Sequence, residues 1–305
     1  MSKAAIETVR QAAAKFGGDA LDLLVGQPYY GPPRSLADAL ALAARQGSGE
    51  YGPPGGLAGL KEKLCAKERA TGLEIAQESI VIGNGSKGLL FGLLSTLPSD
   101  TVIVPTPAYP AMLAQPKLIG KQIQQLPLDE PFRLSADDLD RIEATNGILV
   151  VSSPSNPTGM SIENSQWPLI IEKCRQRRIR LIVDEVYRDL RFGGEAPGWK
   201  EIDPDLDTVV IVRSFSKSHG ICGWRLGYVM ANSETAMALT KWQSTALNPP
   251  STPVQRAFES WLPGDNSQLV IIIKHYRNCA NRFAEVLEYA GFTPLLPEGG
   301  LYVFA

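Results

Sequence analysis

Histidine and cysteine are scarce in this 305-residue chain, and their scarcity excludes whole classes of site. There are 2 histidines and 4 cysteines, and no two cysteines form a CxxC pair. Zinc sites need clustered Cys and His ligands, so we predict no metal site. Scattered cysteines are typical of free thiols in a reducing compartment, which predicts a cytoplasmic protein. The cysteines are Cys65, Cys174, Cys222 and Cys279.

An excess of charge of either sign is also lacking. Lys and Arg together number 30 and Asp and Glu 32, which gives a formal net charge of −2. This balance argues against nucleic acid and anionic membranes as partners. Near the N-terminus, Glu7 and Arg10 interrupt the apolar residues. We therefore predict neither a signal peptide nor a membrane span there.

What the sequence does contain is a series of short runs rich in Val, Ile and Leu. Near-continuous apolar character is typical of strands that are buried on both faces, and helical patterns lie between several of the runs. Together they predict an α/β fold with a mainly parallel central sheet covered by helices. We expect strands at 79–83, 101–105, 147–153, 179–185, 208–214 and 226–231, and helices at 86–97, 135–145, 163–178 and 265–290.

The domain organisation is indicated by Pro- and Gly-rich segments at 26–34 and 47–56, which mark crossings between structural units. We expect a large domain at 46–273 and a small α/β domain formed by 1–45 and 274–305. The chain ends on GGLYVFA, a strand-like run whose backbone groups would need partners. We therefore expect that the natural protein continues and that the small domain is truncated at its C-terminus.

Polar groups follow the predicted strands, where ligands bind in sheets of this kind. Asn156 follows the third run, Asp184 and Tyr187 follow the fourth, and Lys217 follows the fifth. The sequence thus delivers an amide, a carboxylate with a phenol, and an amine to strand ends. A lone lysine is ordinarily a surface charge, but Lys217 stands among small and apolar residues with Arg225 close by.

A glycine-rich motif, GNGSKG at 83–88, follows the first run and opens a predicted helix. It matches the GxGxxG of dinucleotide sites, which also need an acid about 20 residues further on. That region reads VIVPTPAYP, so the dinucleotide interpretation fails. A phosphate cup made by Gly85, Ser86 and Lys87 at a helix N-terminus remains consistent with the motif, and a glycine-rich turn without a ligand is the alternative.

Taken together, the motifs resemble those of the class I/II aminotransferases of the fold type I pyridoxal-phosphate (PLP) superfamily. The order and spacing of the motifs carry the resemblance, which covers about residues 20 to 305. The matching stretches are YGPPGG at 51–56, GNGSKGLL at 83–90, PTPAYP at 105–110, SNPTG at 155–159, DEVYRDL at 184–190, SFSK at 214–217 and GWRLGY at 223–228. The resemblance implies fold type I and PLP as the cofactor.

The resemblance also implies roles for the residues that would hold the ring of the cofactor. Lys217 would form a Schiff base with the aldehyde and later move protons. Asp184 would pair with the pyridine nitrogen and keep it protonated. Asn156 and Tyr187 would donate hydrogen bonds to the phenolic oxygen, and Tyr109 would stack on the ring. Each position also has an ordinary alternative. Asp184 could be a strand-end acid and Asn156 part of a plain turn. Tyr187 could be a core aromatic and Tyr109 a packed loop residue.

A second set of residues is implied for the phosphate and the substrate. Arg225 would bind the phosphate in a bidentate manner, and the hydroxyls of Ser214 and Ser216 would assist. These residues add to the predicted cup of Gly85, Ser86 and Lys87. Gly26 resembles part of the segment that closes over the substrate, and with Asn156 it is expected to contact the substrate.

The implied activity is an aminotransferase that moves an amino group between an amino acid and a 2-oxo acid. The implied mechanism is ping-pong, through a Lys217 aldimine. Tyr51 resembles a tyrosine that reaches the phosphate of the neighbouring subunit, which implies a homodimer with shared active sites; a loop tyrosine is the alternative. The same site could instead serve elimination, replacement, cyclisation or oxidation, and a non-catalytic effector-binding module is a further alternative.

Some positions depart from the family pattern. The arginine that holds the substrate carboxylate in the family would lie beyond Ala305, so it cannot be assigned. His219 stands where the family has an aromatic or aliphatic residue, and we expect packing more than an active-site role. Gln27, Tyr29 and Tyr30 stand where the family often has an acid and small residues, and they could shape an unusual substrate pocket. The resemblance also implies cis peptide bonds before Pro107 and Pro157.

Overall fold

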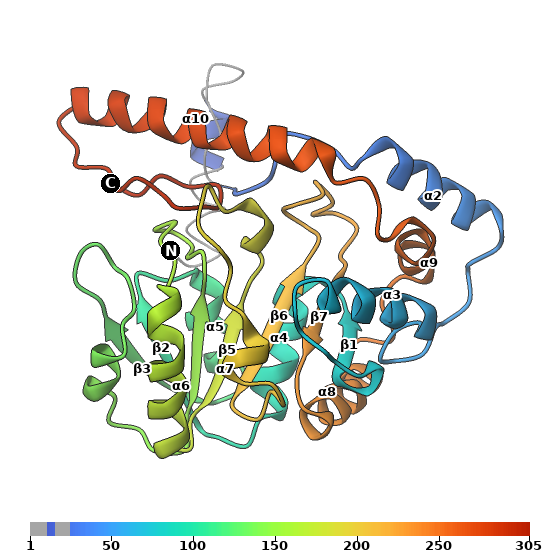
Figure 1. Ribbon diagram of the computed structural model, residues 1–305, viewed down its shortest axis with the longest axis horizontal. Coiled ribbons are helices and arrows are strands. Elements are labelled where there is room, and N and C mark those ends of the chain that lie inside the picture. Colours follow the sequence, from blue (N-terminus) through green and yellow to red (C-terminus); the bar gives the residue numbers. More distant parts are fainter. Residues whose placement is uncertain (1–10, 16–24) are drawn as a thin grey trace.

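The computed structural model describes residues 11–15 and 25–305. These residues build a seven-stranded sheet with helices on both faces (Figure 1). The strand order is β1-β7-β6-β5-β4-β2-β3; β7 runs antiparallel to both of its neighbours, and the other pairs are parallel. The strands are β1 (Ile80–Gly83), β2 (Thr101–Thr106), β3 (Gln122–Pro127), β4 (Ile148–Ser152), β5 (Arg180–Asp184), β6 (Val209–Ser214) and β7 (Gly227–Met230). The predicted mainly parallel sheet is confirmed.

The core lies in two layers, one on each face of the sheet. Along β5, Leu181 and Val183 belong to one buried cluster and Ile182 to the other, because successive side chains of a strand point to opposite faces. One layer is closed by α2 (Arg34–Arg45), α3 (Ala58–Arg69), α6 (Trp167–Gln176) and α9 (Thr252–Trp261), and the other by α4 (Gly85–Thr96), α5 (Pro110–Leu118) and α8 (Ser233–Ala246). Burial on both faces explains why the central strands are almost wholly apolar.

A long helix, α10 (Ser267–Tyr289), crosses above the sheet, and the C-terminal segment lies beneath it (Figure 1). The helix predicted at 265–290 is therefore confirmed. The C-terminal segment forms isolated bridges between Leu295 and Phe304 and between Arg191 and Gly299. In the described part of the chain, no helix is long and apolar enough to cross a membrane. The proposed division into a large and a small domain stays a prediction.

Two expectations about the elements were wrong. The predicted helix at 135–145 is only a 3-10 turn, Asp137–Arg141. Ser135 donates both its N–H and its hydroxyl to Asp138, at 2.8 Å each, so a local polar contact is present where the longer helix is not. Strand β3 was missed because its sequence, QIQQLP, is polar. It lies at the edge of the sheet, where burial does not demand apolar residues. The remaining short elements are α7 (Trp199–Ile202), η2 (Gln77–Ser79), η4 (Asn164–Gln166) and η5 (Arg188–Leu190).

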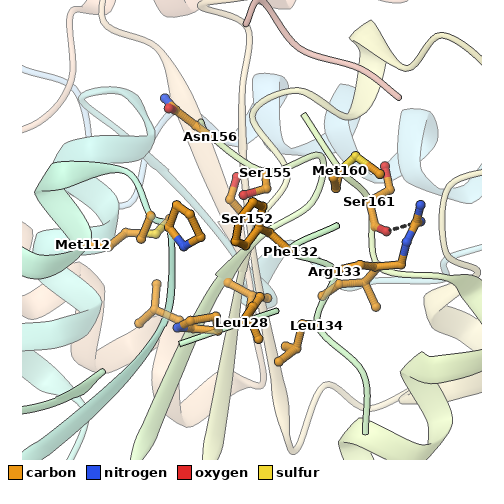
Figure 2. A pocket seen from close by; sticks show the side chains of 16 residues that line it. Met112, Leu128, Phe132, Arg133, Leu134, Ser152, Ser155, Asn156, Met160 and Ser161 are labelled. Carbon is orange, nitrogen blue, oxygen red and sulfur yellow. Dashed lines mark hydrogen bonds between the residues drawn. The ribbon is translucent and has the colours of Figure 1, made fainter. Parts of the chain in front are cut away.

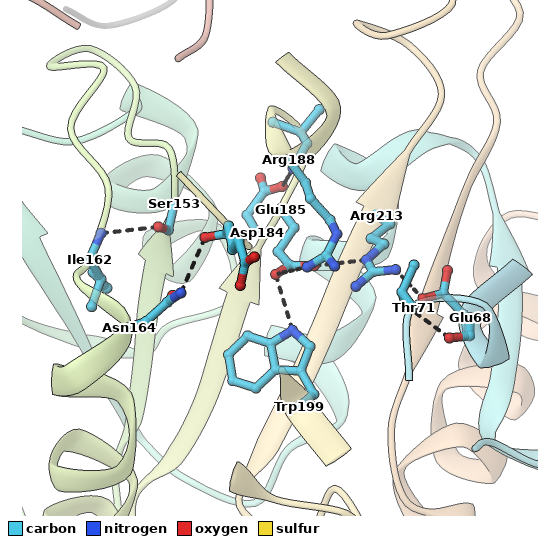
Figure 3. A network of polar contacts seen from close by, with 12 residues as sticks. Glu68, Thr71, Ser153, Ile162, Asn164, Asp184, Glu185, Arg188, Trp199 and Arg213 are labelled. Carbon is cyan, nitrogen blue, oxygen red and sulfur yellow. Dashed lines mark hydrogen bonds and ion pairs between the residues drawn. The ribbon is translucent and has the colours of Figure 1, made fainter. Parts of the chain in front are cut away.

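A buried network of charges ties α3 to the ends of β5 and β6 (Figure 3). Arg213 on β6 donates to Glu185 with an Nε–Oε2 distance of 2.7 Å, and its NH1 pairs with Glu68 of α3. Glu185 also accepts hydrogen bonds from Trp199 and Arg188, and Glu68 accepts one from Tyr228. Burial would raise the pKa of Glu68, but Arg213 with its neighbours holds that pKa at about 2. The network fixes the backbone immediately after Asp184.

The network predicts a large effect of Arg213→Met. This substitution leaves two buried carboxylates without their common partner, so the free energy of unfolding should fall by about 3–5 kcal/mol. Urea unfolding at pH 7 measures the loss. The control is Arg256→Met, whose ion pair with Glu259 is largely exposed and should contribute about 0–1 kcal/mol. Equal losses in the two variants would contradict the role assigned to Arg213.

Candidate active site

The strand ends surround a cavity of about 270 Å³. The parallel register of β4, β5 and β6 places Ser152, Asp184 and Val212 side by side, so the loops that follow these strands open on the same edge of the sheet. The cavity is lined by ten of the residues predicted for the site: Gly26, Ser86, Lys87, Tyr109, Asn156, Asp184, Tyr187, Ser216, Lys217 and Arg225. Sequence motifs spread over most of the chain are thus brought together.

Lys217 projects its amine into this cavity and is held at both of its ends. The Nζ atom donates to the carbonyl oxygen of Gly26 at 2.5 Å and contacts the sulfur of Cys222 at 3.6 Å. The hydroxyl of Tyr30 donates to the backbone carbonyl of Lys217 at 2.7 Å. Gly220, with φ of +64°, lets the loop pass so close to Tyr30 that a Cβ would stand 2.4 Å from the Tyr30 carbonyl oxygen. The segment at 25–31 therefore clasps the lysine.

Asp184 is a buried acid that lacks a cationic partner at hydrogen-bond distance among the described residues. One carboxylate oxygen accepts the N–H of Val186 at 3.0 Å. Burial, with a smaller contribution from Glu185, raises the pKa of Asp184 to about 7, although the N–H of Val186 and the nearby Lys217 oppose the shift. A buried carboxyl group of this kind would be stabilised by a cationic ring nitrogen. Asp184 therefore fits the pyridine side of PLP.

Asn156, Tyr187 and Tyr302 form the polar wall beside Asp184. The phenol of Tyr187 is buried, and burial followed by the proximity of Tyr302 raises its pKa well above 10, whereas Asn156 opposes the shift. The rings of Tyr187 and Tyr302 pack edge to face at 6.4 Å. Tyr302 also reaches Gly26, where a Cβ would lie 1.9 Å from its hydroxyl oxygen. These groups can donate to an oxygen on a bound ring, which also fits PLP.

Another part of the cavity lining suits a phosphate. Helix α4 begins at Gly85 and presents its free N–H groups beside Ser86 and Lys87, and a helix N-terminus favours an anion. Arg225 lies against Gly85 so closely that a Cβ there would stand 2.5 Å from its guanidinium. Its NH2 donates to the Asn84 carbonyl at 3.2 Å. The wall combines a guanidinium, an amine and backbone donors.

The two serines of SFSK have different positions. Ser216 lines the cavity, whereas Ser214 lies behind it and shares a hydrogen bond with the Ser216 hydroxyl at 2.9 Å. Gly85 is likewise absent from the cavity lining, but it packs against the Arg225 guanidinium. The ring of Tyr109 lines the cavity, with the Lys87 amine 6.0 Å from its centroid. These placements agree with a ring face beside Tyr109 and a phosphate beside Ser216.

Tyr51 is not brought into this cavity; 85% of it is exposed in the isolated chain. His219 also lies outside the cavity lining. Its ring packs edge to face on Phe215 and Trp261, at 5.2 and 5.4 Å, and burial lowers its pKa to about 4. The position of His219 therefore agrees with the expected packing role.

The cis peptide bonds expected before Pro107 and Pro157 are both present.

Sequence reasoning missed several cavity residues, among them Tyr302, Cys222 and Val25. It named Tyr30 only as an unusual residue and not as a partner of Lys217. A smaller cavity of about 30 Å³ lies beside the main one and shares Asn156 with it (Figure 2). It is large enough for one water molecule. No single motif predicted it, because its lining combines parts of PTPAYP and SNPTG with strand β4 and other segments.

Comparison with known proteins decides the family. The family model for aminotransferase class I and II matches residues 18–305. The chain belongs to this family. Members of the family depend on PLP, and the residues described above fit that cofactor, so the protein is a PLP-dependent aminotransferase that acts on amino acids and 2-oxo acids.

Several aminotransferases are similar to this chain. Aspartate aminotransferase of Bacillus subtilis is 30% identical over an alignment of 297 residues, and the match covers 94% of this chain and 76% of that protein. The aspartate aminotransferase of Thermus thermophilus, solved with maleate, superimposes with a TM-score of 0.89 at 26% identity and covers 99% of this chain and 81% of its own. For the aromatic aminotransferase of Pyrococcus horikoshii, the TM-score is 0.87, the identity 26% and the two shares 95% and 80%.

The buried acid of this aminotransferase predicts a pH-dependent effect of Asp184→Asn on the protein freed of PLP. The pKa of Asp184 is raised from 3.8 to about 7, so the unfolded chain releases this proton more readily than the folded one. The folded state therefore loses stability as the pH rises between these values, by an amount on the order of 4 kcal/mol. Asp184→Asn should be more stable than the parent at pH 8 and close to it at pH 4.

Urea unfolding at both pH values measures this difference. Asp205→Asn, at an exposed position, is the control and should follow the parent at both. The same Asp184→Asn change should weaken PLP binding, because an amide cannot pair with a protonated ring nitrogen as a carboxylate does. A variant that gains no stability at pH 8 would show that the acid is not penalised by its surroundings.

Proposed function

We propose that Lys217 carries the cofactor of this aminotransferase and moves the proton at the substrate Cα. The observation that supports this most strongly is the shared cavity. The Lys217 amine and the Asp184 carboxyl, which has no cationic partner at hydrogen-bond distance among the described residues, line one space together with Arg225 and the start of α4. If Asp184 held the ring nitrogen of PLP and Arg225 its phosphate, Lys217 would supply an amine for the aldehyde within the same cavity.

The residues around the cavity divide the work. When bound, PLP supplies an electron sink for the charge that develops at the substrate Cα. Asp184 keeps the ring nitrogen protonated, and Asn156 and Tyr187 hydrogen-bond the ring oxygen. Tyr109 covers one face of the ring. Once it is free, the Lys217 amine takes the proton from Cα, and it remains close enough to return a proton within the same site.

The phosphate end anchors the cofactor while Lys217 is free. Arg225, Ser216, Ser86 and Lys87 line that end of the cavity, and Gly85 and Ser214 support them. These contacts retain the cofactor between the two halves of a ping-pong reaction, when no covalent bond to the protein exists. Gly26 and Asn156 contact the substrate in this proposal. The similar enzymes are named for different amino acids, so the proposal specifies no single donor.

The role of Lys217 gives a direct prediction. Purified protein should be yellow, and borohydride should bleach the band and fix the cofactor to one lysine. Peptide mapping should place it on Lys217. Lys217→Ala should abolish turnover while it retains some PLP affinity through the phosphate contacts, measured by fluorescence titration. Cofactor found on Lys87, the other amine of the cavity, would overturn the assignment.

Spectra with single amino acids distinguish transamination from other PLP chemistry. If the protein is an aminotransferase, an amino acid alone should convert the bound cofactor to pyridoxamine phosphate, with one 2-oxo acid released for each site. Addition of a 2-oxo acid should then restore the original spectrum. Release of ammonia or loss of the substrate side chain, without pyridoxamine phosphate, would instead indicate that the site has been diverted to elimination or replacement.

We further propose a homodimer in which Tyr51 reaches the phosphate of the neighbouring subunit. The high exposure of Tyr51 in the isolated chain and its place before the rigid Pro53-Pro54 step support this proposal. A cytoplasmic location belongs to the same proposal. It is supported by the free state of Cys65, Cys174, Cys222 and Cys279.

The shared site predicts a specific effect of Tyr51→Phe. Loss of one hydrogen bond to a charged phosphate should cost about 1.5–3 kcal/mol, which is roughly a tenfold to hundredfold loss of PLP affinity. The absorption of bound cofactor should not change. Mixing inactive Lys217→Ala protein with an inactive Tyr51 variant should restore some activity, because hybrid dimers contain one intact site. A fully active monomer in light scattering would refute the model.

A further inference from the structure

The thiol of Cys222 lies beside the lysine amine and has no part in the function proposed above. Its sulfur is 3.6 Å from Lys217 Nζ and donates to the carbonyl oxygen of Ser216 at 3.2 Å. Both residues line the same cavity. Cys222 is half-buried there, whereas Cys65 and Cys174 are buried. A thiol and a primary amine therefore stand in van der Waals contact in a space that a small oxidant can enter.

We propose that Cys222 and Lys217 form an oxidation site, in which a peroxide links the two side chains through a sulfur–nitrogen bond. In the first step, the sulfur of Cys222 attacks hydrogen peroxide and becomes a sulfenic acid, and water is released. The sulfur is oxidised by two electrons and the peroxide O–O bond is broken. In the second step, the Lys217 nitrogen attacks that sulfur, the S–N bond forms, and the sulfenic oxygen leaves as water.

The position of the amine favours this second step. Sulfenic acids condense with a nearby nucleophile, whether a thiol or a nitrogen. Lys217 Nζ is the only nitrogen nucleophile that contacts the Cys222 sulfur among the hydrogen bonds of the described residues. The flexible lysine side chain lets the two atoms close the remaining distance. The link consumes the amine, so the cross-linked protein cannot attach PLP covalently.

The site is reversible by thiol chemistry. A small thiol attacks the sulfur, breaks the S–N bond and returns the Lys217 amine, leaving a mixed disulfide on Cys222. A second thiol molecule then releases the Cys222 thiol and forms a small disulfide. The cross-link depends only on the two side chains. Its protection by PLP rests on the proposed function, because the amine is unavailable while it carries the cofactor.

The test treats the purified holoenzyme with hydrogen peroxide, with and without an amino acid donor that frees the lysine. Trypsin cuts after free Lys217, but not after a lysine bonded to sulfur. The expected product is the uncut peptide 214–225, lighter by two hydrogen atoms than the unmodified sequence. It should disappear, with cleavage at Lys217 restored, after incubation with dithiothreitol before digestion.

Three variants control the experiment. Cys222→Ser should give no such peptide, and Cys279→Ser, which removes an exposed thiol, should give as much as the parent. Lys217→Arg should instead accumulate the sulfenic acid on Cys222, which dimedone labels. The proposal is overturned if oxidised protein with its lysine freed is still cut at Lys217, whether Cys222 is unmodified or carries only oxygen.

The comparison with and without the amino acid donor tests the oxidation site separately from the proposed role of Lys217 as the cofactor lysine. More cross-link with the amino acid than without it is the result expected if Lys217 holds PLP. Equal cross-linking in both arms would leave the oxidation site standing and contradict the assignment of Lys217 as the cofactor lysine. Absence of the cross-link in both arms, while borohydride still fixes PLP to Lys217, would overturn the oxidation site alone.

Discussion

The burial of one carboxyl group, that of Asp184, is the constraint on which the site depends. A carboxylate at the end of a central strand is costly unless a positive charge meets it. The surrounding protein supplies one backbone N–H and a lysine whose amine is directed elsewhere. The fold thus carries an electrostatic cost in its own interior, and a cationic ligand offsets that cost. The affinity for a cationic ligand and the chemical role of Asp184 therefore have the same origin, the buried carboxyl group.

The neighbouring residue shows the opposite solution to the same problem. Glu185 is also buried, but Arg213, Arg188 and Trp199 all donate to it. Of these two consecutive acids, Glu185 therefore has cationic partners in the protein, whereas Asp184 has none at hydrogen-bond distance among the described residues. The satisfied acid holds the turn through a network that reaches α3 (Figure 3), and this rigidity keeps the other acid aimed into the cavity. A site of this kind needs both, because an unpaired carboxyl group on a yielding turn would move towards solvent.

Much of this arrangement could be predicted from the sequence, for a physical reason. Central strands are buried on both faces, so they must be apolar, and the polar residues that end them stand out. Asn156, Asp184 and Lys217 were found in this way. The edge strand β3 was missed because burial places few demands on it. The helix expected at 135–145 was wrong, since only the short 3-10 helix Asp137–Arg141 forms there.

Contacts between segments that are distant along the chain could not be predicted from the sequence. Tyr30 contacts the Lys217 carbonyl across 187 residues of sequence, and Tyr302 contacts Gly26 across almost the whole chain. No local pattern encodes such pairs, since each depends on how loops from different strands fold over one another. Tyr51 marks a different limit. Its predicted partner would belong to a second subunit, so an isolated chain can only show that it is exposed.

Because the segment at 25–31 contacts both the amine and the backbone of Lys217, its attachment depends on the chemical state of that lysine. The amine donates to the Gly26 carbonyl, and Tyr30 holds the lysine backbone from the other side. When the amine is taken up in another bond, it has fewer hydrogen atoms to donate to Gly26, while the Tyr30 hydrogen bond to the lysine backbone does not involve the amine. The fold thereby converts a covalent event at one nitrogen atom into a change in how firmly a remote part of the polypeptide is tethered.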